Sequence, residues 1–187
     1  MGLISHVILG LKLFFVNLFD FSSEVTKLQK IRNVCNFLIF NMLWTALMIT
    51  FLVSAFGFQI GEIKSLVASN FTLKAASKLF NTDIRAALFL GCVLAPLWEE
   101  AVFRYVAIRL GQGLDQLLGK AWMLLPVVCL SSIIFGRAHG NSLNILFQGV
   151  GGFGLCWLYL KNKNSYWSVV SAHAIWNLII IGGTNLV

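Results

Sequence analysis

Six apolar stretches run along this chain, and each is long enough, or nearly so, to cross a bilayer as a helix. They cover residues 3–21, 34–58, 84–110, 121–138, 142–160 and 166–185. A membrane-spanning helix needs roughly 20 apolar residues. Only 11% of the 187 residues are charged, whereas a soluble domain averages about 25%. We therefore predict an all-α fold, a polytopic membrane helix bundle of about six spans, with residues 1–187 forming a single integral-membrane domain.

The segments between these stretches are polar and mostly short. Residues 24–33 form a charged connector, and residues 111–120 and 161–166 look like short turns. In the longest polar segment, residues 61–83, apolar residues alternate with lysines, which favours interfacial amphipathic helices over a further span. If every apolar stretch spans, seven Lys and Arg residues lie on one side and five on the other. This weak bias places the 22–33, 111–120 and 161–165 loops in the cytoplasm and the N-terminus outside.

The net charge of +7 does not indicate a nucleic-acid partner. The cations flank apolar stretches and do not gather into a basic patch, so we expect them to hold helix ends at the membrane–water interface. The four cysteines form no CxxC or zinc spacing. The glycine-rich GVGGFG at residues 149–154 predicts a helix that packs closely against its neighbours, because small residues let two backbones approach.

Three charges interrupt the third apolar stretch, in the sequence WEEAVFR at residues 98–104. A charged group at the bilayer centre costs about 2.5–3.5 kcal/mol on insertion scales. Glu100 and Arg104 are four residues apart, with the acid N-terminal to the base, which is the favoured order for an ion pair on one helix face. Glu99 is turned about 100° away on the helix and has Phe103 at i+4. We therefore predict a supporting Glu100–Arg104 pair and a free Glu99 that can act as general base.

Two histidines in later apolar stretches supply further polar groups. His139 follows Phe135 by four residues, and His173 precedes Asn177 by four, so each pair lies on one helix face. His173 and Asn177 can both donate hydrogen bonds toward one point, as an oxyanion hole requires. His139 and His173 could instead be axial ligands of a haem in an electron-transfer bundle, and Glu99 could be the proton relay of a transporter.

These spacings together resemble a known family. EExxxR at residues 99–104, FxxxH at 135–139 and HxxxN at 173–177, in that order on successive apolar stretches, are similar to the motifs of the CAAX protease and bacteriocin-processing enzymes, also called the Abi family. That family includes the type II CAAX prenyl endopeptidases. The resemblance covers about residues 84–180, which would be the protease core, and leaves residues 1–80 as peripheral helices.

The resemblance implies a glutamate-dependent intramembrane endopeptidase. From the size of the chain we expect it in a bacterial or archaeal cell membrane. Glu99 and His139 would activate a water that attacks the scissile carbonyl, and His173 and Asn177 would stabilise the oxyanion. Phe135 would pack the motif. The substrate would be a peptide or lipidated peptide, such as a prenylated CAAX tail, a bacteriocin leader or a signalling peptide. Since HExxH is absent, we expect no metal and no other cofactor. A non-catalytic peptide-binding or bacteriocin immunity protein stays open as the alternative, and the oligomeric state is not predicted.

One difficulty follows from the expected spans. If 84–110 and 121–138 are simple antiparallel helices, Glu99 and His139 differ in depth by roughly 10 Å at 1.5 Å per residue. We therefore expect the helix that carries His139 to start near Pro126, since proline is favourable in a first turn. Residues Gly119 to Leu125 would then be partly interfacial.

Overall fold

In the computed structural model, the chain forms a bundle of α-helices, and its described residues, 24–67, 83–119 and 122–185, contain no strand. The predicted all-α fold is confirmed. The elements are α2 (Lys27–Phe56), α3 (Ile60–Val67), α5 (Ile84–Phe89), η1 (Leu90–Leu94), α6 (Ala95–Glu100), η2 (Ala101–Val106), α7 (Ala107–Leu118), α8 (Leu124–Ala138), η3 (Ile145–Gly149), α9 (Val150–Lys161) and α10 (Tyr166–Asn185), where η denotes a π-helical segment.

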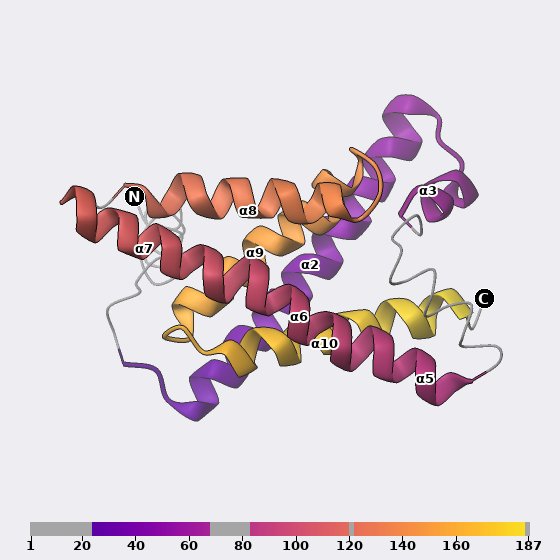
Figure 1. Ribbon diagram of the computed structural model, residues 1–187. Helices are drawn as coiled ribbons and strands as arrows, with labels where there is room; N and C mark the ends of the chain where they lie inside the picture. Colours follow the sequence, from indigo (N-terminus) through magenta and orange to yellow (C-terminus); the bar gives the residue numbers. More distant parts are fainter. Residues whose placement is uncertain (1–23, 68–82, 120–121, 186–187) are drawn as a thin grey trace, which may run out of the picture.

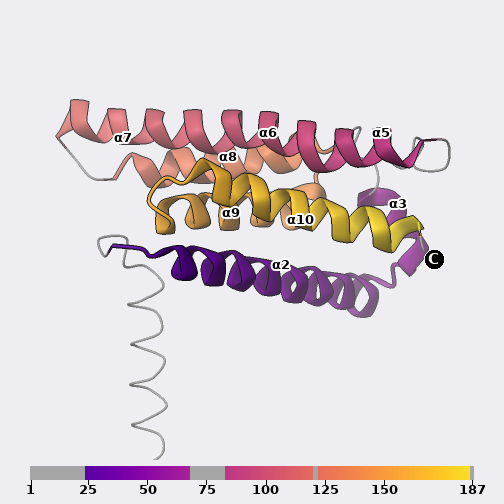
Figure 2. The same cartoon turned by 90° about the horizontal axis from the view of Figure 1, so that it is seen from below.

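The helices lie in layers, with α10 near the middle. Figure 2 shows the continuous helix from α5 to α7 along one side, α2 along the opposite side, and α8, α9 and α10 between them. Helix α8 runs back along α7, and α10 runs beside η1 and α6 (Figure 1). This arrangement brings the middle of the α5–α7 helix, the end of α8 and the middle of α10 to one region of the bundle.

Helix α2 begins earlier than the sequence analysis predicted. Thr26 caps it through a capping box, in which Gln29 N donates to Thr26 Oγ1 and Thr26 N donates to Gln29 Oε1. This reciprocal pair satisfies two of the donors that every helix start leaves free. The expected charged connector at residues 24–33 is therefore wrong from Lys27 onward, because those residues are the first turns of the helix.

The helix that carries Glu99 is also longer than predicted, and this reduces the difference in depth between Glu99 and His139. The turn expected at residues 111–120 is wrong: the helix continues to Leu118 and ends at Gly119, whose φ of 61° suits glycine. Helix α8 starts at Leu124, so Pro126 lies in its first turn. Glu99 is 19 residues before Leu118 and His139 is 15 residues after Leu124. At 1.5 Å per residue the two therefore differ in depth by only about 6 Å.

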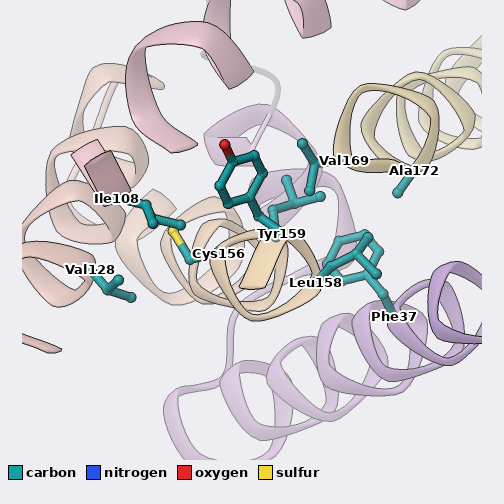
Figure 3. Close-up of a cluster of buried hydrophobic side chains, with 9 residues drawn as sticks. Phe37, Ile108, Val128, Cys156, Leu158, Tyr159, Val169 and Ala172 are labelled. Atoms are coloured by element: carbon teal, nitrogen blue, oxygen red, sulfur yellow. The ribbon is translucent and has the colours of Figure 1, made fainter. Parts of the chain in front are cut away.

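The bundle is held by close packing around α9. Figure 3 shows Phe37 of α2, Ile108 of α7, Val128 of α8 and Ala172 of α10 gathered around Leu158 and Tyr159. The expected close approach of the glycine-rich segment is confirmed, because a Cβ on Gly154 would lie 2.9 Å from the Phe37 ring. In lipid, such van der Waals packing stabilises helix association in place of the hydrophobic effect.

The chain is a membrane protein by the composition and exposure of its helices. Lys27–Phe56 and Ile84–Leu118 are long and apolar enough to cross a bilayer, and Leu124–Ala138, Ile145–Lys161 and Tyr166–Gly182 are shorter apolar helices. Large apolar side chains such as Leu43, Trp98 and Leu130 point outward, each more than half exposed. Such a surface suits lipid rather than water. The first expected stretch, 3–21, lies outside the described residues, as does most of the predicted amphipathic segment, namely residues 68–82.

Candidate active site

The two adjacent glutamates lie at the junction of α6 and η2, on a helix whose hydrogen-bond ladder is interrupted on both sides. The π-helical segment η1 precedes α6, and η2 follows it. A π-helical turn inserts an extra residue and leaves carbonyl groups without their usual partner, and such turns are frequent at functional sites. Within this helix, carbonyls of η1 and η2 accept hydrogen bonds from other helices.

Asn177 of α10 uses one of these carbonyls. Its Nδ2 donates to Gly91 O at 2.7 Å. The Gly91 carbonyl is available because Ala95 N donates instead to Leu90 O and because Pro96 has no N–H to offer. A proline that the sequence places inside a span thus creates the acceptor that orients Asn177.

Glu100 is fully buried and contacts two cationic or polar partners. Arg104 Nε lies 3.0 Å from Glu100 Oε2, at the predicted i, i+4 spacing. His173 Nδ1 lies 2.6 Å from Glu100 Oε1. The sequence analysis gave Glu100 only one partner, and that part of the interpretation needs correction. A carboxylate that accepts from Nδ1 fixes the orientation of the imidazole and leaves its Nε2 pointing elsewhere.

Glu99 faces both histidines. Its Oε2 lies 3.8 Å from His139 Nε2 and 3.7 Å from His173 Nε2. This oxygen is buried and accepts no hydrogen bond from the described residues. Distances just beyond direct hydrogen bonding are those at which a water molecule can bridge two polar groups.

The backbone around His139 fixes its ring. His139 Nδ1 lies 2.6 Å from Phe135 O, and because a carbonyl can only accept, Nδ1 carries a hydrogen. Its Nε2 therefore faces Glu99. Asn144, fully buried in the loop after α8, donates from Nδ2 to His139 O at 2.6 Å. Sequence reasoning missed Asn144, although an asparagine within an apolar stretch is the type of signal that reveals such a residue.

Phe135 is the common packing surface of the motifs. The Arg104 guanidinium carbon lies 4.1 Å from the centre of its ring, and the ring centres of His139 and His173 lie 4.4 and 6.0 Å away. A Cβ on Gly152 would lie 2.9 Å from the Phe135 ring. The sequence therefore needs glycine at this point of α9 to admit the phenylalanine.

The side chains named by the three motifs thus occupy one region. Glu99, His139 and His173 point toward one another, Glu100 and Arg104 support His173 from behind, and Asn177 lies one turn further along α10. His173, Asn177 and Phe135 line a cavity of about 60 Å³, enough for several water molecules. Within the described ranges, no three His, Cys, Asp or Glu side chains are grouped as metal ligands.

This arrangement of buried carboxylates, imidazoles and a carboxamide beside a cavity, within a membrane bundle, defines a candidate hydrolytic site. The family model described as type II CAAX prenyl endopeptidase Rce1-like matches residues 81–179. The match covers more than half of the chain and includes all three motifs, so the protein belongs to this family of CAAX-type membrane endopeptidases. Searches of curated proteins and of solved structures found no significant match.

Proposed function

We propose that this protein is a glutamate-dependent intramembrane endopeptidase that hydrolyses a peptide bond in a membrane-associated or lipidated peptide. The family match supports a CAAX-type endopeptidase acting on a peptide. The observation that carries the detailed proposal is the position of Glu99 Oε2 within 3.8 Å of two imidazole nitrogens, with no hydrogen-bond donor among the described residues.

Glu99 and His139 activate the attacking water. Both Glu99 Oε2 and, in the neutral ring, His139 Nε2 are acceptors, so a water between them donates one hydrogen to each. As the water oxygen bonds to the scissile carbonyl carbon, one of the two acceptors takes its proton. The same proton then passes to the leaving amine when the C–N bond breaks, which returns the site to its starting state.

His173 and Asn177 stabilise the oxyanion. Asn177 uses one amide hydrogen for Gly91 O and has a second to donate. In its doubly protonated form, His173 donates from Nδ1 to Glu100 and from Nε2 to the oxyanion. The charges of Glu99, Glu100, Arg104 and His173 then sum to zero, which lowers the cost of placing four polar groups in a bundle surrounded by lipid.

The direct test is cleavage of a farnesylated CAAX peptide, labelled with a fluorophore and quencher, by the purified full-length protein in lipid vesicles. We expect the wild type to cleave it, with products identified by mass spectrometry. Glu99→Gln should lower kcat by about 10³-fold or more, because the amide can neither accept the proton of the attacking water nor hold that water in the same position. Glu24→Gln, which changes an exposed glutamate before α2, serves as control and should cleave normally. Equal cleavage by Glu99→Gln would disprove the mechanism.

The same assay distinguishes an enzyme from a protein that only binds peptides, and it identifies the class of substrate. An unprenylated leader peptide and a prenylated CAAX peptide, compared side by side, test which substrate class the protein accepts. A wild type that binds either peptide and leaves its mass unchanged over long incubation would instead support a non-catalytic peptide-binding or bacteriocin immunity protein.

A further inference from the structure

Polar side chains from two other segments share the cavity with His173 and Asn177, whereas Glu99 and His139 are not among its lining residues. Asn41 and Thr45 of α2 and Gln148 of η3 line it together with His173 and Asn177. Its remaining walls are largely apolar or aromatic, and include Phe37, Phe147, Leu155, Trp176 and Ile180. None of the three additional polar residues belongs to the motifs that the catalytic proposal uses.

The two carboxamides in this wall have unused hydrogen-bonding capacity. Asn41 is only 5% exposed; its carboxamide lies at the wall of the cavity and makes no hydrogen bond to another described residue. Gln148 Oε1 is buried and likewise accepts no hydrogen bond within the described ranges. Burying an amide without a partner is unfavourable. Gln148 Oε1 therefore gains a hydrogen bond only when the cavity holds a polar occupant, and the Asn41 carboxamide faces the same space.

The backbone nearby leaves room for Asn41. A Cβ on Gly151 would lie 3.0 Å from Asn41 Oδ1, which is tighter than ordinary van der Waals contact. Glycine at this position of α9 admits the carboxamide against the wall of the cavity. Asn41 lies before the segment 81–179 that the family model matches, so α2 adds this group from outside the shared motifs.

A peptide substrate brings the matching chemistry. An endopeptidase substrate enters as extended chain, and inside a membrane bundle its N–H and C=O groups lose water and need partners. Many proteases and peptide-binding domains meet this need with a strand edge, but the described part of this chain has no strand. A carboxamide offers one donor and one acceptor side by side, the same pair that a peptide group presents.

We propose that Asn41 and Gln148 form a subsite that hydrogen-bonds a backbone peptide group of the substrate next to the scissile bond. This inference rests on the proposed endopeptidase function and assigns it a specific binding contact. Because the subsite borders His173 and Asn177 in one cavity, a peptide group held there places the adjacent carbonyl beside the groups that stabilise the oxyanion.

The first test separates binding from chemistry with the farnesylated, quenched CAAX peptide. Asn41→Leu and Gln148→Leu remove the carboxamides while keeping similar volume, and each should raise KM about tenfold with kcat within about threefold, as loss of one or two hydrogen bonds predicts. Asn36→Leu on α2 and Gln116→Leu on α7 make the same exchanges at exposed positions and should leave KM unchanged. Thermal unfolding of each purified variant verifies folding. Unchanged KM in both cavity variants overturns the subsite.

A second test changes the peptide. Replacing one backbone amide at a time, on either side of the intact scissile bond, by an ester removes a single N–H donor. The wild type should lose about tenfold in affinity at one position, and Asn41→Leu or Gln148→Leu should lose nothing further there, since the contact is already absent. If the cavity holds only water, the ester series is flat and the variants change kcat rather than KM, which overturns the proposal.

Binding measured by fluorescence anisotropy in the Glu99→Gln background distinguishes failure of the subsite from failure of the proposed function. Weaker binding on adding Asn41→Leu supports the subsite, even if the wild type cleaves nothing. The opposite result is an affinity that is unaltered when either Asn41→Leu or Gln148→Leu is added to Glu99→Gln. If the wild type nevertheless cleaves the peptide, that result overturns the subsite and leaves the endopeptidase function standing. A wild type that neither binds nor cleaves the peptide overturns both.

Discussion

His173 Nδ1 lies 2.6 Å from Glu100 Oε1, so the second glutamate of the EExxxR motif connects two helices and two partners. Glu100 holds Arg104 within its own helix and His173 from α10. Glu99 instead faces both imidazoles at 3.7–3.8 Å and accepts no hydrogen bond from the described residues. The two adjacent carboxylates therefore differ in kind. Glu100 is part of the internal framework, and Glu99 is the group that we propose interacts with water and substrate.

This difference predicts effects of unequal size on stability for the same substitution. Glu100→Gln removes the carboxylate from a buried pair and leaves Arg104 buried without a counter-charge, a change that costs about 3–5 kcal/mol in comparable sites. Glu99→Gln removes a carboxylate that contacts the imidazoles only at 3.7–3.8 Å and accepts no hydrogen bond from the described residues, so it should lower stability much less. Both variants should lose activity. Thermal unfolding of the purified variants in one detergent measures the contrast, and equal melting temperatures would contradict it.

Pro96 gives a prediction about the orientation of Asn177. Pro96→Ala restores an N–H that can bond to the Gly91 or Cys92 carbonyl, which competes with the Asn177 amide for Gly91 O. We expect kcat to fall about five- to tenfold, the equivalent of one weakened hydrogen bond, with no loss of stability. Kinetics of the cleavage assay and a parallel melting curve give both values. An increase in KM alone would show that Pro96 acts on substrate binding rather than on Asn177.

The motifs of the site could be predicted from the sequence because their internal spacing is local. The i, i+4 spacings of Glu100 with Arg104, Phe135 with His139, and His173 with Asn177 each follow from the periodicity of one helix. Their rarity in an apolar chain marks them, since ionisable groups in a bilayer need compensation. The roles assigned to Glu99, His139, His173 and Asn177 remain predictions, although the structure brings the first three together.

Contacts between helices could not be predicted in the same way. The Glu100–His173 contact joins residues 73 positions apart, and the Asn177–Gly91 bond depends on a local change from α- to π-helical bonding that no periodicity reveals. The ends of helices were the other source of error. Residues 111–118 carry two glycines and polar side chains, which resemble a turn, yet packing of α7 against α8 keeps them helical, because tertiary contacts outweigh intrinsic propensity.

A metal-independent mechanism has its own test. In the proposed mechanism Glu99 and His139 activate water without a metal ion, so extensive dialysis against EDTA or 1,10-phenanthroline should leave the cleavage rate within about twofold of the untreated protein. Metal analysis of the purified, active protein should find less than one equivalent of zinc. Loss of activity on chelation that added Zn²⁺ restores would contradict the prediction and assign the two histidines to a metal ion instead.

Gly136 and Gly113 make a matched pair for testing how tightly the end of α8 is packed. A Cβ on Gly136 would lie 2.7 Å from Ile145 Cα and 2.9 Å from Asn144 O, and these backbone atoms belong to the loop and π-helical segment that follow His139. Gly136→Ala should therefore displace this segment, lower the free energy of unfolding by about 1–3 kcal/mol, as overpacking of a tight contact does, and abolish cleavage.

Gly113→Ala in α7 is the matched control. Its Cβ meets no atom within 4 Å, so it should raise the free energy of unfolding by up to about 1 kcal/mol through better helix propensity. Melting curves and cleavage rates of the two variants measure the difference, and a Gly136→Ala protein as stable and active as the wild type would mean that the close approach of α8 and η3 is not needed to hold His139 in place.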